Sequence, residues 1–252
     1  MQKSHLKQSD TVLAIGVDCN SIIKLLTHSK SVLFYGTDKR QVQEIKLKVS
    51  ANRDIKNMFK IIDCDIIEYE IPNIDVVISC VSFNLTCPIV LKLMSSNFRC
   101  AFILVQKEFA DKLLAKSGSN DYSKLSVVTQ LMSKIEHVLK VSKNSYSPPL
   151  NIDTCFVKIQ LRSPKVPIDV MEFERLLKFC FNRKNKLLSS NLNCPQFHSH
   201  IIDVIECDKK EASRLILQII ANCDFKTTRP SKMHVEDFLK LLLEFKKTGV
   251  SF

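Results

Sequence analysis

The sequence predicts an α/β protein in which a sheet carries helices on both faces and a small helical domain follows. Short β-rich apolar runs alternate with helical patterns over the first two thirds of the chain, which is typical of a parallel sheet. After the proline-containing segment Arg162–Pro167, only helical periodicity remains. We therefore expect two domains, residues 1–163 and residues 164–252.

Five apolar runs supply the expected parallel strands. They are Thr11–Ile15, Ser31–Tyr35, Phe59–Ile62, Asp75–Ser79 and Cys100–Val105. The helices expected among them are Ser21–Leu26, Lys39–Val49, Pro88–Met94 and Glu108–Ala115. Each strand is short, and four of the five are followed by a helical pattern, as in βαβ units.

Two later runs and three helices complete the prediction. Lys134–Val141 and Asp153–Leu161 are expected to form an antiparallel edge of the sheet. The helices expected beyond the linker are Val170–Phe181, Lys209–Ala221 and Val235–Phe245, with Asp208 as a candidate N-cap.

Charge and cysteine content narrow the class of protein. The chain of 252 residues has 37 Lys and Arg against 26 Asp and Glu, so its net charge is +11. This balance favours a polyanionic partner, nucleic acid before an anionic membrane, although charge that only keeps the protein soluble is the alternative. Ten scattered Cys without a C-x-x-C pair indicate core residues in a reducing compartment.

No targeting or membrane signal is expected. The start of the chain, Met1–Lys7, is polar, and no apolar run approaches the ~20 residues that a spanning helix needs. The sequence thus predicts a soluble intracellular protein.

Several blocks resemble one family in the right order. Phe98–Ala110 is similar to its "RCA…QREFA" segment, Leu114–Leu131 to "LVAKPGD..Y.RLSVNTQL", Val141–Pro149 to "VGKNNFRPPP", and Arg183–Lys186 to "FVRKNK"; the tail Met233–Leu242 resembles the eukaryotic branch. On these blocks the chain is identified as a member of the rRNA adenine N6,N6-dimethyltransferase family from about Ser9 to Phe252.

The resemblance implies a Rossmann-like class I methyltransferase sheet with a small helical C-terminal domain that binds rRNA. It implies S-adenosyl-L-methionine as cofactor and two adjacent adenines near the 3′ end of small-subunit rRNA as substrate. It also implies a part in small-subunit assembly.

The methyl-donor motifs of that family are altered in this chain. Where the family has "EIGPGTGN", the segment Ala14–Asn20 keeps only Gly16 of three glycines. Gly36 stands where the family has the acid that binds the ribose, and Asp38 is offset from it by two residues. Asp65 matches the acid that contacts the adenine amine of the donor. With about ten residues before the first strand, the family's upstream lid is not expected here.

The loop that aligns the target adenine in the family, "N-[IL]-P-[YF]", is also altered. Its Asn oxygen and a backbone carbonyl orient the amine, and its aromatic ring stacks on the flipped base. The matching residues are Cys80, Ser82 and Phe83, of which Phe83 alone keeps its chemistry. A thiol is a weak acceptor and Ser lacks the fixed φ of proline. A nucleophilic Cys80 is the alternative, but a core cysteine fits better because no thiolate methyltransferase motif accompanies it.

Basic residues beside the first C-terminal helix are the predicted RNA contacts. They are Arg175, Lys178, Arg183, Lys184 and Lys186, with a second cluster of Lys107, Lys112, Lys116 and Lys124. A solvated helix face is the alternative for each residue singly. Cys194, His198 and His200, with Cys207 nearby, lack the paired spacing of a structural zinc site, so no metal is predicted.

Two functions follow as hypotheses. The first is a small-subunit ribosome assembly protein that binds small-subunit rRNA and has degenerate or lost methyltransferase activity. The alternative is an active S-adenosylmethionine-dependent dimethyltransferase. The expected partners are small-subunit rRNA and pre-ribosomal or ribosomal proteins, without a membrane. We expect a monomer in the nucleolus, nucleus and cytoplasm, with the small subunit or its precursor.

Overall fold

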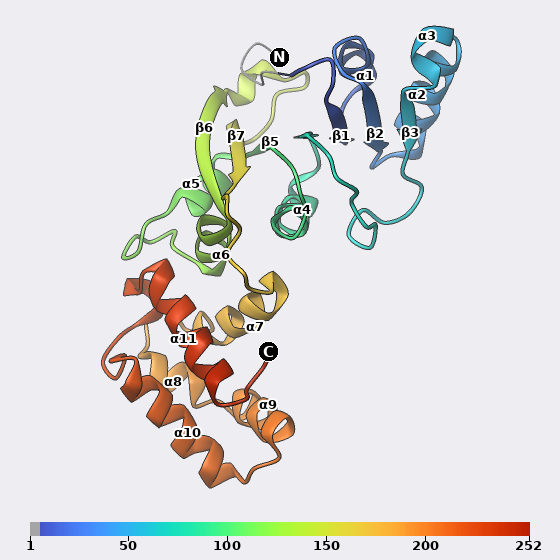
Figure 1. Ribbon diagram of the computed structural model, residues 1–252. Helices are drawn as coiled ribbons and strands as arrows, with labels where there is room; N and C mark the ends of the chain where they lie inside the picture. Colours follow the sequence, from blue (N-terminus) through green and yellow to red (C-terminus); the bar gives the residue numbers. More distant parts are fainter. Residues whose placement is uncertain (1–5) are drawn as a thin grey trace. The chain divides into compact units, whose positions relative to one another are not determined.

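The computed structural model describes residues 6–252 (Figure 1). Residues 1–5, which carry most of the expectation about the start of the chain, lie outside the described residues. The chain divides into two compact units. The sheet unit comprises Met1–Ala110 and Ser133–Lys165, and the helical unit comprises Asp111–Met132 and Val166–Phe252.

The sheet unit is built on seven strands in the order β3-β2-β1-β4-β5-β7-β6. The strands are β1 (Thr11–Ile15), β2 (Ser31–Tyr35), β3 (Phe59–Ile61), β4 (Val76–Ser79), β5 (Cys100–Gln106), β6 (Ser133–Val141) and β7 (Thr154–Leu161). The first five pair in parallel, whereas β7 is antiparallel to both β5 and β6. The predicted parallel sheet with an antiparallel edge is therefore confirmed.

Helices cover the sheet because both of its faces are apolar. The helices that begin in this unit are α1 (Cys19–Leu26), α2 (Lys39–Ser50), α3 (Arg53–Lys56), α4 (Phe83–Met94) and α5 (Lys107–Leu114). On one face, Val12, Phe34 and Val76 cluster with buried residues of α1 and α2. The alternate residues Leu13 and Val77 point to the other face and are equally buried.

Helix α4 begins five residues earlier than predicted. The prediction that it starts at Pro88 is wrong, because the helix runs from Phe83 with Pro88 in its interior. Proline removes the hydrogen bond to the carbonyl four residues back, that of Asn84. Asn84 is exposed, so water can take the place of the missing donor. The early start matters because it places Phe83, the last of the predicted loop residues, in the first helical turn.

The helical unit contains α6 (Lys124–Met132), α7 (Val170–Cys180), α8 (Leu188–Leu192), α9 (Pro195–Ile205), α10 (Lys209–Asn222) and α11 (Val235–Lys247). The predictions for α7, α10 and α11 are confirmed, and Asp208 caps α10 in a capping box with Glu211. Buried aromatic side chains form much of its core, among them Phe173, Phe197 and Phe238.

The compact units differ from the expected division at residue 163 in the placement of Asp111–Met132. This segment groups with the C-terminal helices because α6 packs against both α7 and α11. Among the described residues, no helix has both the length and the apolar character needed to cross a bilayer.

Candidate functional site

The carboxyl ends of β1, β2 and β4 meet around Gly16. Its backbone N–H donates to the carbonyl of Tyr35 at 2.8 Å, and the N–H of Cys80 donates to the carbonyl of Ile15 at 2.9 Å. Gly16 has a φ of +63°, and a Cβ there would lie 2.8 Å from the carbonyl oxygen of Cys80. Only glycine combines this left-handed backbone with so close an approach. The chain itself therefore requires Gly16, whether or not a ligand is bound.

The turn after Gly16 is closed by an acidic side chain. Asp18 is the N-cap of α1, and it accepts the hydroxyl of Ser21 at 2.6 Å and the N–H of Ser21 at 3.1 Å. Burial acts to raise the pKa of Asp18, but the hydrogen bonds from Ser21 and from the backbone of Asn20 and Asp18 together outweigh it, so the pKa lies below its ordinary value. A carboxylate consequently sits at the helix N-terminus, where an anionic group of a ligand would otherwise be favoured.

The second strand ends in a position closed to an acidic side chain. A Cβ built on Gly36 would lie only 2.3 Å from Cγ2 of Val42 and 3.1 Å from the ring of Phe34. Val42 belongs to α2 and packs against the core of the sheet unit. Its methyl group thus fills the space that the Cβ of any other residue at position 36 would need.

The two surviving acids of the predicted donor site have local partners. Asp38 is the N-cap of α2 and accepts the N–H of Arg40 at 2.9 Å. Asp65 accepts the N–H of Ile67 at 2.8 Å, in a turn that follows β3. Both carboxylates are exposed, and each stabilises the turn in which it lies.

The loop after β4 has a thiol where the resemblance predicts an amide acceptor. Burial, with a smaller effect of the Asp18 carboxylate, raises the pKa of the Cys80 thiol to about 11. Cys80 is thus a protonated thiol near neutral pH, which is neither a nucleophile nor a good acceptor. Ser82 has φ −56° and ψ 146°, which proline would also adopt, and Phe83 is the first residue of α4.

The predicted RNA contacts in the helical unit fall into two groups. Arg175, Lys178 and Lys186 are exposed, and their side chains have no ion pair among residues 6–252. The guanidinium of Arg183 instead donates to the carbonyl and hydroxyl of Ser190 at 2.9 and 3.2 Å. The Lys184 ammonium donates to the carbonyls of Asn120 and Tyr122, at 2.6 and 3.3 Å.

Lys184 belongs to a junction that ties together three of the family-like sequence blocks. We call it the block junction, and its residues are Ser117, Gly118, Asn120, Tyr122, Lys184, Ser231 and His234. Ser231 donates its N–H to the Lys184 carbonyl at 3.0 Å and accepts the N–H of Gly118 at 2.7 Å. The Ser117 hydroxyl meets Nδ1 of His234 at 3.2 Å. Sequence reasoning found the blocks but not their meeting point, because the partners are up to 117 residues apart.

The second predicted basic cluster is also divided. Lys124 forms an ion pair with Glu174 at 2.7 Å, which joins α6 to α7. Lys107, Lys112 and Lys116 are exposed. The helical unit thus uses part of its basic charge to hold its own loops and helices in place.

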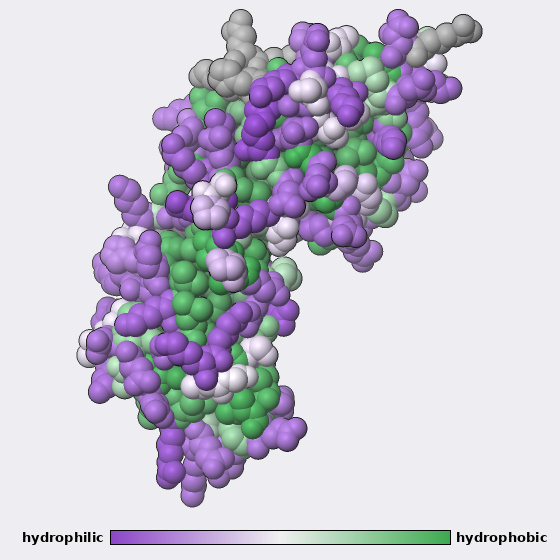
Figure 2. Space-filling view, in the orientation of Figure 1, coloured by the Kyte–Doolittle hydropathy of each residue, from purple (hydrophilic) through white to green (hydrophobic). Residues whose placement is uncertain are grey.

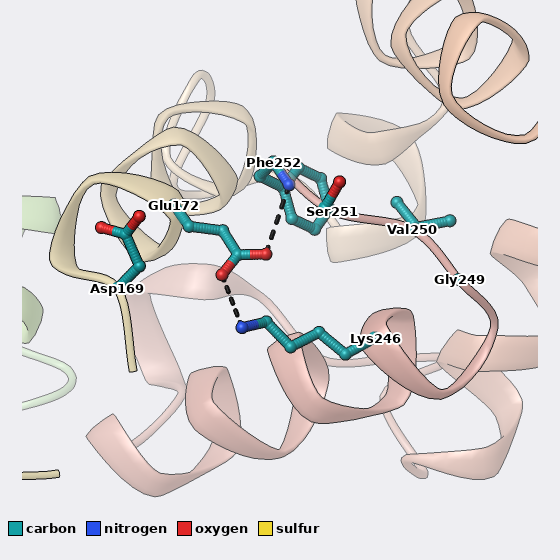
Figure 3. Close-up of a pocket in the computed structure, with 7 residues that line it drawn as sticks. All are labelled: Asp169, Glu172, Lys246, Gly249, Val250, Ser251 and Phe252. Atoms are coloured by element: carbon teal, nitrogen blue, oxygen red, sulfur yellow. Dashed lines mark hydrogen bonds and ion pairs between the residues drawn. The ribbon is translucent and has the colours of Figure 1, made fainter. Parts of the chain in front are cut away.

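A polar cavity of about 520 Å³ lies where the last residues pack on α7 and α11 (Figure 3). The buried carboxylate of Glu172 accepts Nζ of Lys246 at 2.6 Å and the N–H of Phe252 at 3.4 Å. The ring of Phe252 stacks on Phe197 and on His200. Nothing in the sequence identified this contact, whose polar groups are matched by the chain itself.

The histidines of α9 are not arranged around a metal. Nε2 of His200 lies 2.8 Å from the carbonyl of Ser251, and His198 is buried. Within the described part of the chain, no group of three or more His, Cys, Asp or Glu side chains is placed to bind a metal ion.

The sheet order and the helical unit define the class: a Rossmann-like methyltransferase sheet with an appended helical domain. The family model described as "Ribosomal RNA adenine dimethylase" matches residues 1–215. A probable dimethyladenosine transferase of Dictyostelium discoideum is 35% identical over 271 residues, covering 100% of this chain and 85% of that protein. The corresponding protein of Caenorhabditis elegans is 34% identical, covering 100% and 86%. This chain belongs to the ribosomal RNA adenine dimethylase family.

Solved structures agree with this assignment. A dimethyladenosine transferase from Plasmodium falciparum matches with a TM-score of 0.83 and 29% identity over 98% of this chain and 94% of that one. The 23S rRNA methyltransferase ErmE matches with a TM-score of 0.63 and 17% identity over 97% and 94%. The likeness to ErmE concerns the fold alone.

Proposed function

We propose that this protein is an rRNA-binding assembly factor of the small ribosomal subunit that has lost methyl transfer. The observation that carries the proposal is the closure of the ribose position. Gly36 supplies no acceptor there, and Cγ2 of Val42 lies 2.3 Å from the position that a Cβ on residue 36 would take. An acid at position 36 would meet the Val42 methyl group, so that side chain would have to shift to admit it.

The residues present do not fit S-adenosylmethionine, the methyl donor of the family. A bound nucleoside needs acceptors for its ribose hydroxyls and a turn that its backbone can approach closely. Of the predicted donor residues, Asp38 and Asp65 cap local turns, and Gly16 is required by the chain itself. Asp18 adds a side chain to the turn. We derive no methyl transfer through this site.

The adenine-aligning loop supports the same proposal. Adenine N6 reacts only when its lone pair is held in line with the methyl group, which takes two well-placed acceptors. A thiol with a pKa of about 11 cannot replace the amide oxygen of the family motif. Loss of this acceptor removes alignment even if a donor were bound.

RNA binding is the part of the family function that we assign to this chain. Three exposed cations, Arg175, Lys178 and Lys186, are available to phosphates in the helical unit. Small-subunit rRNA and neighbouring ribosomal or pre-ribosomal proteins would be the partners. Such a factor would act on the subunit or its precursor in the nucleolus, nucleus and cytoplasm.

One observation favours an active dimethyltransferase as the second candidate. The backbone of Ser82 keeps the φ and ψ of a proline, and Phe83 still begins α4 next to it. The loop is therefore shaped to receive a base although its acceptor is gone.

Calorimetry separates the two candidates. The whole chain is titrated with S-adenosylmethionine, and the Plasmodium falciparum dimethyladenosine transferase serves as a positive control for family members. We expect no heat of binding at micromolar donor, together with salt-sensitive binding to a transcript of the 3′ domain of small-subunit rRNA. Micromolar donor affinity, or dimethylation of that transcript, would establish the active enzyme instead.

A further inference from the structure

Basic charge is concentrated in one short stretch of the sheet unit. The stretch Lys39–Lys60 contains seven basic and two acidic residues, a net charge of +5 in a protein whose total is +11. It makes up α2, α3 and β3. Because β3 is the last strand on its side of the sheet, this charge lies along one lateral edge. Hydrophilic side chains cover much of the surface in that region (Figures 1 and 2).

Most of these cations are not used for folding. Lys48 pairs with Glu44 at 2.7 Å. Lys39, Arg40 and Lys46 are exposed, and within residues 6–252 their side chains have no ion pair. Lys56 and Lys60 are exposed as well. The edge therefore presents free positive charge.

The outer face of α2 arranges this charge in rows. Ile45 and Val49 face the core, so the opposite side of the helix faces solvent. Lys39 and Lys46 are seven residues apart, nearly two turns, which places them in line at about 10 Å along the axis. Arg40 and Leu47 form a parallel row by the same spacing, and Leu47 is 74% exposed.

This arrangement works against the stability of the helix. Lys39 and Arg40 occupy the first turn of α2, which has no acidic residue. Cations there oppose the helix dipole. The exposed side chain of Leu47 adds no hydrophobic stabilisation to the helix. Features that weaken local structure without a compensating contact indicate a surface used for binding.

We propose that the outer face of α2, with Lys56 and Lys60 beside it, is a second RNA-binding surface that contacts the phosphate backbone of rRNA. It rests on the proposed function and adds a contact on the sheet unit to those of the helical unit. The exposed cations Lys39, Arg40 and Lys46 suit phosphates, and the neighbouring acid Glu44 is already paired with Lys48 at 2.7 Å. A lipid surface does not fit, because Leu47 is a single apolar residue without an apolar face.

The test is the salt dependence of binding to a transcript of the 3′ domain of small-subunit rRNA. The triple variant Lys39→Gln/Arg40→Gln/Lys46→Gln removes three phosphate contacts. Because each contact contributes about 0.7 to the slope of log affinity against log salt, the magnitude of that slope should fall by about 2. The matched control is Lys134→Gln/Lys140→Gln/Lys143→Gln, which removes equal charge on and just after β6, at the other edge of the sheet. Leu47→Ser should weaken binding without changing the slope.

Each outcome decides a separate point. An unchanged slope in the triple variant, or an equal fall in the control, overturns the surface on α2 but leaves the assembly-factor proposal standing. An unchanged slope together with lost binding of a purified acidic ribosomal protein assigns the surface to a protein instead. If the wild-type protein shows no salt-sensitive binding to the transcript, both the surface on α2 and the assembly-factor proposal are overturned. Thermal melting checks folding, and the triple variant should melt no lower than wild type, since it removes unfavourable charge from the first turn of α2.

Discussion

The carboxyl edge of the sheet and the block junction of the helical unit differ in whether their residues match the family and have hydrogen-bond partners within the chain. At the sheet edge, Gly36 and Cys80 stand where the resemblance predicts contacts to a ligand, and neither offers a good acceptor. At the block junction, each named residue bonds to another part of the same chain, such as Lys184 to Asn120 and Gly118 to Ser231. In this chain, the family-like sequence blocks of the helical unit therefore coincide with internal hydrogen bonds.

Gly16 differs from Gly36 and Cys80, because it lies at the same sheet edge and still matches the glycine motif of the family. Its positive φ and its contact with the Cys80 carbonyl are internal requirements. A retained motif glycine is therefore no sign of a retained ligand here.

The largest effect is expected from Gly16→Ala. The added Cβ meets the Cys80 carbonyl at 2.8 Å on a left-handed backbone, so the free energy of unfolding should fall by roughly 2–4 kcal/mol. Gly249→Ala is the control, because Gly249 has φ +81° but nothing within 4 Å of its Cβ position. It should cost about 1–2 kcal/mol. Equal losses in thermal or urea unfolding would show that the close approach is not a constraint.

The next largest effect is expected at Lys184, and the nearby Lys186 should behave differently. Lys184→Met removes the donor to the Asn120 and Tyr122 carbonyls, and we expect a loss of roughly 1.5–3 kcal/mol in unfolding free energy. Lys186→Met should leave stability within about 0.5 kcal/mol. It should instead lower the salt slope of rRNA binding by about 0.7. If Lys184→Met melts like wild type, the hydrogen bonds of the block junction do not account for the resemblance of its sequence to the family.

A smaller effect tests whether Val42 closes the ribose position. Gly36→Ala should be destabilising because its Cβ meets Val42, and the loss should largely disappear in a Val42→Ala background. We expect a coupling of about 1–2 kcal/mol in the double-mutant cycle of unfolding free energies. Additive changes would mean that Val42 moves aside freely and that the position is open.

Much of the fold could be predicted, because strand and helix patterns are local. The parallel order follows from alternation, and the antiparallel edge follows from two consecutive apolar runs. Helix α6 was missed because nearly all of Leu125–Met132 is buried, so no polar face marks its period. It also passes into β6 at Ser133 without a turn residue. The unit to which α6 belongs depends on its packing with α7 and α11, which no local pattern contains.

The roles of the site residues were harder to predict, because the type of a residue does not identify its partner. Asp38 and Asp65 have the chemistry of ligand-binding acids, but their partners are N–H groups two residues away. A capping Asp and a ribose-binding Asp look alike in sequence. Lys184 is one of a basic run that suits phosphates, yet its acceptor at Asn120 lies 64 residues away. Residue type predicted the kind of contact, and only the fold could supply the partner.

The smallest expected effect asks whether the adenine loop has kept its shape for structural reasons. Ser82 already has φ −56° and ψ 146°, and among the described residues its N–H donates no backbone hydrogen bond outside regular elements. Ser82→Pro should therefore leave the fold intact and raise the unfolding free energy by about 0.4–1 kcal/mol, through lost freedom of the unfolded chain. Cys80→Pro is the control, because it removes the N–H that bonds to the Ile15 carbonyl, and it should melt well below wild type. If Ser82→Pro destabilises instead, the proline-like backbone is incidental. If it stabilises and Cys80→Asn/Ser82→Pro still transfers no methyl group, the defect lies in the donor pocket rather than in the loop.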